Sequence, residues 1–144
     1  MDFQDCIKFA NENPVCYFAT VENDQPRVRG LRMWFADNSG FYFQSQFVKA
    51  LCKQLKKNNK VEVCFRAPEP GPIGTVLRVA GRVEFVDDMA LKARVIKERL
   101  SLKEMGIVRP DDPILAVFRI YTGEAFFWTT KYSMKEAEIK RIKF

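Results

Sequence analysis

The chain has 144 residues, of which 47% are hydrophobic and 29% charged, and its net charge is +6. This length suits one domain covering residues 1–144. Histidine is absent, which excludes His-dependent catalytic triads and removes the commonest general base and metal ligand. Any chemistry must therefore come from a bound cofactor or from Lys, Arg, Tyr, Cys and carboxylate side chains.

Residues 2–12 predict a short amphipathic helix that ends before Pro14. This segment is acidic and lacks the cationic start and apolar middle of a signal peptide. No apolar run in the sequence approaches the length of a membrane span. We therefore expect a cytoplasmic protein. Its four cysteines show no paired close spacing, so we expect reduced core residues instead of disulfides or a zinc site.

Two strands are predicted next, at 15–21 and 26–35, joined by a polar turn. Alternate side chains of a strand share one face, so Arg27 and Arg29 lie on the same face as Leu31. That face begins cationic and ends apolar. Arg29 is therefore the stronger candidate for holding a buried anion, with a surface ion pair as the alternative. Arg27 can instead pair with an acidic residue of the turn.

A hairpin turn at 37–40 leads into a predicted strand at 41–45 and an amphipathic helix at 47–58. Lys49 falls in the first turn of this helix, where the helix dipole disfavours a cation. Ser45 can cap the helix or bind a phosphate through its hydroxyl. A phosphate near the strand arginines would satisfy Lys49 as well, although Lys49 can also be one of several exposed lysines on a basic helix.

The second half of the chain is also predicted to be rich in strands, with Gly81 at a bulge or bend. The tail at 132–144 is basic and shows no clear pattern. Many short antiparallel strands predict a mainly β fold, a small β-barrel with peripheral helices. The predicted elements are strands at 61–66, 75–86, 114–121 and 124–130, a Pro/Gly loop at 67–74, and a helix capped by Asp87 or Asp88 that runs to about residue 102.

Four segments follow one another along the chain: FATVENDQPRVRG, GFYFQSQFVKALCKQLKKNNKVEVCF, LRVAGRVEFVDD and GEAFFW. In this order and spacing they resemble the pyridoxamine 5′-phosphate oxidase-like family of FMN-binding split barrels, from about residue 13 to residue 130. The resemblance implies an antiparallel split β-barrel that forms a homodimer and binds FMN between its subunits. Among the shorter members, the chain is most similar to the nitroimidazole-resistance and general-stress flavoproteins.

The resemblance also implies a cofactor site. It places the FMN phosphate on an arginine and a lysine, and the edge of the flavin ring along a strand. It assigns Trp128 to the partner subunit's site, whereas the residues alone make Trp128 a core or interface aromatic. The implied FMN-binding residues are Arg29, Gly30, Leu31, Arg32, Phe43, Gln44, Ser45, Lys49 and Trp128.

The sequence departs from true pyridoxamine phosphate oxidases. Trp34 and Val76 stand where those enzymes carry a lysine and a glutamine, and their C-terminal substrate segment with Arg and His has no counterpart. These departures argue against oxidation of a vitamin B6 phosphate. We expect an FMN-dependent oxidoreductase that reduces a small substrate, such as a nitroaromatic compound or another xenobiotic, with a nicotinamide cofactor as the reductant. The nitroimidazole-type proteins are associated with an active-site histidine, which this chain lacks.

Two other functions stay open on the sequence alone. The protein can bind a flavin without turnover, as a stress-response or electron-carrier protein, because no acid or base residue stands out. A related cofactor, such as a deazaflavin or heme, can also replace FMN, although the usual histidine ligand of heme is missing. A basic barrel can also bind nucleic acid, and the LKKNNK run and the basic tail permit this. Glutamates interrupt the tail, however, and such lysines more often solvate a protein surface.

Overall fold

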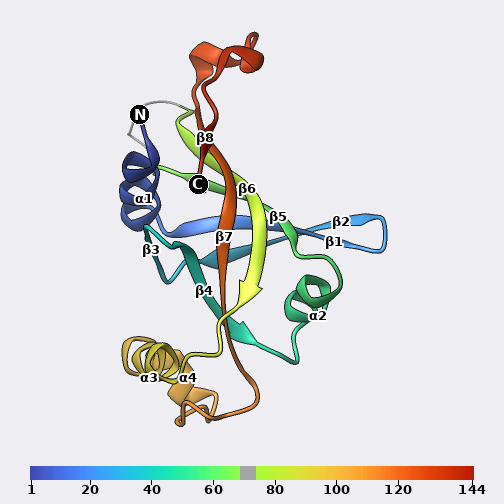
Figure 1. Ribbon diagram of the computed structural model, residues 1–144, viewed down its shortest axis with the longest axis vertical. Helices are drawn as coiled ribbons and strands as arrows, with labels where there is room; N and C mark the ends of the chain where they lie inside the picture. Colours follow the sequence, from blue (N-terminus) through green and yellow to red (C-terminus); the bar gives the residue numbers. More distant parts are fainter. Residues whose placement is uncertain (69–73) are drawn as a thin grey trace.

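A computed structural model of the chain describes residues 1–68 and 74–144. Its strands form a single antiparallel sheet that curls into a barrel, with helices at the periphery (Figure 1). The order in the sheet is β2-β1-β5-β6-β7-β4-β3, and β8 pairs with β7. The mainly β barrel with peripheral helices is therefore confirmed. The strands are β1 Val15–Glu22, β2 Gln25–Arg32, β3 Phe35–Asp37, β4 Gly40–Gln46, β5 Lys60–Arg66, β6 Val76–Phe85, β7 Leu115–Trp128 and β8 Ile142–Lys143.

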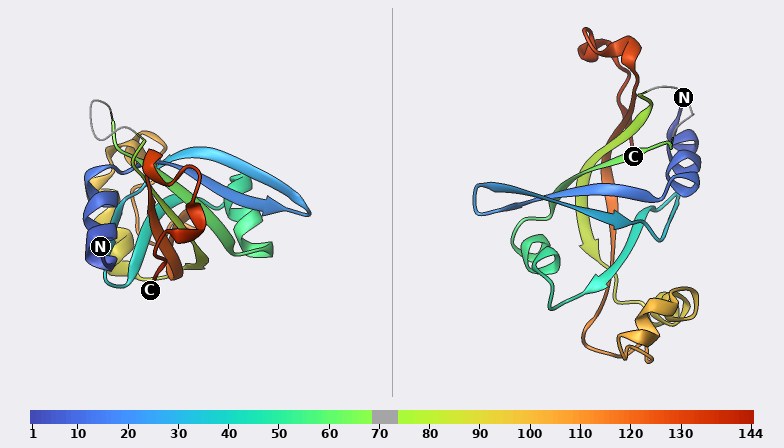
Figure 2. Two further views of the ribbon diagram at one scale, coloured as in Figure 1. Left: turned by 90° about the horizontal axis from the view of Figure 1, so that it is seen from above. Right: turned by 180° about the vertical axis from the view of Figure 1, so that it is seen from behind.

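The helices lie in three places around the barrel (Figure 2). Helix α1 packs against the sheet through Cys6 and Ala10, and a capping box between Asp2 and Asp5 begins it. Helix α2 lies beside the β1–β2 hairpin, and α3 and α4 lie together at one end of the barrel (Figure 1). The bounds are α1 Phe3–Glu12, α2 Ala50–Lys57, α3 Met89–Glu98 and α4 Leu100–Glu104, with 3-10 turns at Thr130–Tyr132 and Glu136–Glu138.

Phenylalanine rings fill the barrel interior. Phe18, Phe43 and Phe118 are at most 1% exposed. The Phe18 and Phe43 rings lie 5.0 Å apart in an edge-on arrangement, and Phe43 stacks on Phe118 at 5.5 Å. Burying each such ring stabilises the fold by roughly 1.5–3 kcal/mol relative to leaving it in water. The side chain of Phe43 therefore belongs to the core, and only its backbone is available to a ligand.

The single strand predicted at 26–35 is wrong, because the chain changes neighbours at Met33 and Trp34. The Met33 amide donates to the carbonyl of Pro14, just before β1, at 2.8 Å. The next amide, of Trp34, donates to the Tyr42 carbonyl in β4 at 2.9 Å. Between these two residues the backbone leaves one side of the barrel and joins the other, which ends β2 and begins β3.

The two strands predicted near the C-terminus are one continuous strand, β7. The Thr122–Gly123 pair, predicted as their connection, lies where β7 crosses β6. Gly123 is the register partner of Gly81, and a Cβ atom at Gly123 would collide with the carbonyl of Ala80. These glycines therefore permit close approach of two backbones. The register shifts just beyond, after Arg82, which agrees with the irregularity predicted at Gly81.

The structure tests two smaller expectations, and a third falls largely outside the residues that it describes. The carboxylate of Asp88 accepts a hydrogen bond from the Leu91 amide at 2.9 Å and caps α3, as predicted. The helix predicted to run to residue 102 is instead divided at Arg99 into α3 and α4. Residues 69–73 of the predicted Pro/Gly loop lie outside the described residues. Within the described ranges, every helix is too short or too polar to cross a membrane.

Candidate functional site

Arg29 lies half-buried between β1 and α2. Its Nη1 donates to the Phe18 carbonyl at 3.3 Å and to Thr20 Oγ1 at 2.8 Å, and its Nη2 donates to Gln54 Oε1 at 2.6 Å. All three acceptors are neutral, and in residues 1–68 and 74–144 no carboxylate forms a salt bridge with Arg29. Burial lowers the pKa of the guanidinium, which the field of Glu22 opposes. Arg29 is thus a cation held in place without direct neutralisation.

Gln54 organises this network from α2, where its side chain is 5% exposed. Its Oε1 also accepts from the Thr20 hydroxyl at 2.6 Å, and its Nε2 donates to Glu22 Oε2 at 3.2 Å. The other carboxylate oxygen of Glu22 accepts from Arg27 at 3.1 Å. The Gln54 amide and then Arg27 hold the pKa of Glu22 below its usual value. The pairing of Arg27 with a turn carboxylate is confirmed, and Glu22 neutralises Arg27 instead of Arg29.

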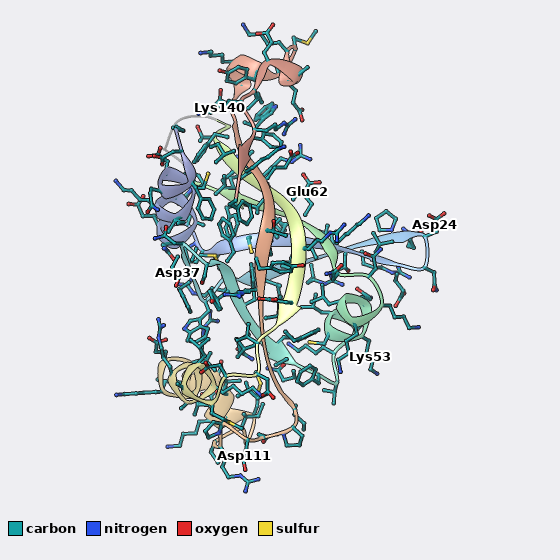
Figure 3. All side chains as sticks on the ribbon, viewed as in Figure 1. Asp24, Asp37, Lys53, Glu62, Asp111 and Lys140 are labelled. Atoms are coloured by element: carbon teal, nitrogen blue, oxygen red, sulfur yellow. The ribbon has the colours of Figure 1, made fainter. Side chains whose placement is uncertain are left out.

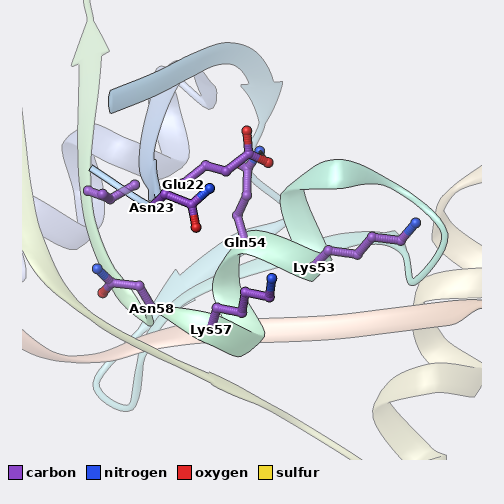
Figure 4. A pocket seen from close by; sticks show the side chains of 7 residues that line it. Glu22, Asn23, Lys53, Gln54, Lys57 and Asn58 are labelled. Atoms are coloured by element: carbon purple, nitrogen blue, oxygen red, sulfur yellow. Dashed lines mark hydrogen bonds between the residues drawn. The ribbon is translucent and has the colours of Figure 1, made fainter. Parts of the chain in front are cut away.

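A cavity of about 420 Å³ opens between α2 and the end of β1. Figure 4 shows the Glu22 and Gln54 side chains meeting at its wall, with Lys53 and Lys57 on the helix. Figure 3 shows Lys53 on the outer side of α2 and Asp24 at the tip of the β1–β2 hairpin. The sequence signal was the LKKNNK run, which supplies Lys57 and Asn58 and which we considered only as a solvated or nucleic-acid-binding patch. The lining residues are Val21, Glu22, Asn23, Lys53, Gln54, Lys57 and Asn58.

Lys49 stands immediately before α2, because the helix begins at Ala50 and not at residue 47 as predicted. Its backbone is extended, with φ −73° and ψ 148°, and its side chain is exposed. The prediction that Ser45 caps this helix is wrong, since Ser45 lies within β4 and is 3% exposed. Its hydroxyl contacts the thiol of Cys52, whose pKa is raised by burial.

The segment Gly30–Arg32 forms the open edge of the sheet. In the described part of the chain, β2 pairs only with β1, so its other edge presents unpaired backbone groups. Apart from Gly30 itself and its two chain neighbours, no heavy atom of the described residues lies within 4 Å of the place where a Cβ atom of Gly30 would stand. Leu31 packs partly against the core. A flat group can therefore approach this edge closely at Gly30 and hydrogen-bond to the backbone beside it.

Strand β4 has a similar open edge beyond Tyr42. Its register with β3 ends at Tyr42, whereas its register with β7 continues to Gln46. Gln44 is half-buried, and its Nε2 donates to the carbonyl of Ser45 at 3.2 Å. The two predicted cofactor segments thus lie on β2 and β4. Each of these strands has a stretch of edge that pairs with no other described strand, and these open edges divide the barrel.

Trp128 lies at the far end of the barrel. It is the last residue of β7 and pairs with Val76, whereas Ala116, near the start of β7, pairs with Ser45. At about 3.3 Å per residue, the two ends of β7 are about 40 Å apart along the strand. Figure 1 shows β7 running from the α3 end of the barrel to the opposite end. One chain therefore does not bring Trp128 together with Lys49.

The cysteines are poor candidates for catalysis. Burial raises the pKa of Cys6 to about 11 and that of Cys16 to about 12. Burial also raises the pKa of Cys64, and no disulfide joins the four thiols. Because a thiolate is the reactive form, these thiols are not nucleophiles at neutral pH.

The family model described as pyridoxamine 5′-phosphate oxidase matches residues 4–129. No curated protein matches the sequence. Among solved structures, a NimC/NimA family protein from Clostridium acetobutylicum is 29% identical, with a TM-score of 0.78, and the match covers 98% of this chain and 92% of that one.

Two further structures share the fold at lower identity. General stress protein 26 from Bacillus anthracis is 17% identical, with a TM-score of 0.74 and complete coverage, 100%, of both chains. An FAD-binding protein from Mesorhizobium loti is 19% identical, with a TM-score of 0.62, and the match covers 87% of this chain and 92% of that one.

Proposed function

Because the chain belongs to the pyridoxamine 5′-phosphate oxidase family, we propose that it is a homodimeric FMN protein that reduces a small substrate. The observation that carries this proposal is Arg29, a half-buried guanidinium held by neutral acceptors beside the open edge of β2. A phosphate is the kind of group that would complete such a site, since charge-assisted bonds to guanidinium are strong and directional. The FAD-binding protein among the structural neighbours supports a flavin as the bound group.

In this proposal the chain's own residues bind and orient the cofactor. Arg29 and the exposed Lys49 hold the phosphate. The backbone of Gly30–Arg32 lies along the ring, where the missing Cβ of Gly30 leaves room. Backbone groups of Phe43 to Ser45 meet it from the open edge of β4. When bound, FMN supplies the redox chemistry, and the protein supplies position and electrostatics.

A second copy of the chain completes the proposed site. Trp128 lies about 40 Å along β7 from Ala116, the register partner of Ser45 near the start of the strand, so it would serve the partner's flavin. The substrate we propose is a nitroaromatic or another small xenobiotic, and the reductant is a nicotinamide cofactor. The replacement of the oxidase lysine by Trp34 supports a substrate other than a vitamin B6 phosphate.

The first test is the visible spectrum of the purified protein after FMN addition and desalting. We expect a retained two-band flavin spectrum, and steady oxidation of NADH or NADPH when a nitroaromatic acceptor is added. A colourless protein that releases FMN would overturn the proposal.

The shared site has a sharper test in mixed dimers. Arg29→Gln and Trp128→Ala homodimers should each bind FMN weakly. A mixed dimer regains one intact site, from Arg29 of one chain and Trp128 of the other. Equal mixing after reversible dissociation should therefore restore about a quarter of the sites, because half of randomly paired dimers are mixed. No recovery in verified mixed dimers would show that Trp128 does not act across subunits.

A flavin-binding role without turnover is the second candidate. It is favoured by the raised pKa values of the thiols and by the absence of histidine, which leave the chain without an evident acid or base at neutral pH. This candidate predicts retained FMN but no nicotinamide oxidation above the rate of free FMN. The same steady-state assay therefore separates the two.

A further inference from the structure

A polar pocket of about 310 Å³ lies where the chain passes from β2 to β3. It is bordered by the end of α1, by the segment from Arg32 to Trp34 and by α3. Because Met33 points into the core and is 1% exposed, its two neighbours Arg32 and Trp34 face the pocket side. The pocket is separate from the cavity beside α2, and none of the cofactor-binding roles above uses Trp34 or α3.

Among the residues that the structure describes, one carboxylate, Glu98, lines this pocket, and it is already engaged. Glu98 accepts a hydrogen bond from Trp34 Nε1 at 2.7 Å through one oxygen and from Arg94 Nε at 3.2 Å through the other. The Arg94 guanidinium also lies over the rings of Trp34 and Phe35, at 5.0 Å and 4.4 Å from their centroids. The positive charge of Arg94 is therefore balanced by Glu98 and by the faces of the two aromatic rings.

Two other guanidiniums at the pocket, those of Arg32 and Arg99, form no salt bridge with a carboxylate of the described residues. Arg99 is half-buried at the junction of α3 and α4, and its Nη2 donates to the backbone carbonyl of Arg32 at 3.2 Å. Burial, and then the field of Arg32, lower the pKa of Arg99, which the field of Glu98 opposes. The fold thus holds two like charges side by side, with donors left for an anion.

We propose that this pocket binds the anionic group, such as a carboxylate, of a small aromatic substrate, with Arg32 and Arg99 as its ligands and Trp34 as the adjoining wall. A planar carboxylate matches the fork of a guanidinium and can accept two hydrogen bonds from it. The inference rests on the proposed function, because Arg32 ends the strand segment on which the flavin ring is placed. A substrate anchored at Arg32 would lie next to that ring.

Binding of benzoate and of its neutral analogue benzamide tests the pocket directly. Tryptophan fluorescence, to which Trp34 contributes together with Trp128, provides a signal that requires no flavin, measured on the protein as purified with its flavin content recorded. We expect benzoate to bind at least tenfold more tightly than benzamide, and Arg99→Gln or Arg32→Gln to weaken benzoate about tenfold while leaving benzamide within twofold. Lys97→Gln is the matched control, since Lys97 is exposed on α3 and does not line the pocket.

Turnover of 4-nitrobenzoate and 4-nitrobenzamide gives the second readout. Arg99→Gln should raise the KM for the acid about tenfold and leave the KM for the amide and both kcat values nearly unchanged. Equal binding of the acid and the amide, or unchanged benzoate affinity in both arginine variants, would overturn the inference. A protein that selects benzoate but does not retain FMN would instead refute the proposed function and leave the anion pocket standing.

Discussion

Arg29 and Arg119 are both half-buried strand arginines, yet their surroundings differ. Arg119 on β7 donates through Nε to Glu84 at 2.6 Å and through Nη1 to the Tyr42 hydroxyl at 2.9 Å. Its charge is neutralised within the barrel by a carboxylate on the neighbouring strand β6. Arg29 makes bonds of similar length, but to a backbone carbonyl, a hydroxyl and the amide oxygen of Gln54.

The difference shows how one residue type serves two purposes. A carboxylate partner makes an arginine a structural element, whose removal leaves an unpaired acid behind. Neutral acceptors orient an arginine and leave its charge for something else. The acceptors around an arginine therefore indicate its role better than its burial does, since both side chains are partly exposed.

Replacing Arg29 gives the largest expected effect. Arg29→Gln should weaken FMN binding by about ten- to hundredfold, because a charge-assisted hydrogen bond contributes about 1.5–3 kcal/mol. The measurement is titration of apoprotein by quenching of FMN fluorescence. The matched control is Arg119→Gln, which should keep FMN affinity and lower the free energy of unfolding in urea by about 0.5–1 kcal/mol, a value typical of a solvent-screened pair. Equal loss of FMN in both variants would remove the distinction between them.

A carboxylate placed beside Arg29 sharpens the comparison. In the double variant Glu22→Gln/Gln54→Glu, the acid moves from the Arg27 side to the Arg29 side without changing the net charge. Arg29 then resembles Arg119, so FMN affinity should fall about tenfold, by roughly 1.4 kcal/mol. The single variant Glu22→Gln is the control and should retain FMN. Undiminished affinity in a folded double variant would contradict the role given to the neutral acceptors.

Lys49 should contribute less than Arg29. It is exposed before α2 and lacks a side-chain cap bond. Lys49→Gln should weaken FMN by about tenfold at low salt and by less as salt rises, because the lost term is a screened Coulomb attraction. The unfolding midpoint in urea should not move. Lys97→Gln, at an exposed position on α3 outside the cavity beside α2, serves as the control for a general loss of positive charge.

The smallest effect concerns pH. The pKa of Glu22 is lowered in the folded state by the Gln54 amide and by Arg27. Its contribution to stability is therefore present above the unfolded pKa, near 4.3, and is lost as pH falls through the lower folded value. Urea unfolding at pH 6 and at pH 3 should show a slightly shallower acid loss for Glu22→Gln than for the parent protein. A steeper loss of stability at acid pH in Glu22→Gln would instead mean that folding raises the pKa of Glu22.

The sequence predicted the β-barrel, and it placed Arg29 on the strand face that it shares with Leu31. Both predictions depend on the local alternation of side chains. It missed the break at Met33, because a change of strand partner is a tertiary event that an unbroken β-rich run does not show. It also missed that Gln54 orients Arg29, since the two residues lie 25 positions apart. The one available signal was a polar residue on the apolar stripe of α2, where Gln54 is buried beside Leu51 and Leu55.

The glycine crossing of β6 and β7 has a consequence for redesign. Most charged residues in the described ranges are exposed, where single substitutions usually change stability little. Gly81 and Gly123 face each other, and a methyl group on either would collide with the opposite backbone. The two positions therefore accept no side chain unless a whole strand moves. Libraries that alter substrate choice should vary the pocket around Trp34 and keep both glycines fixed.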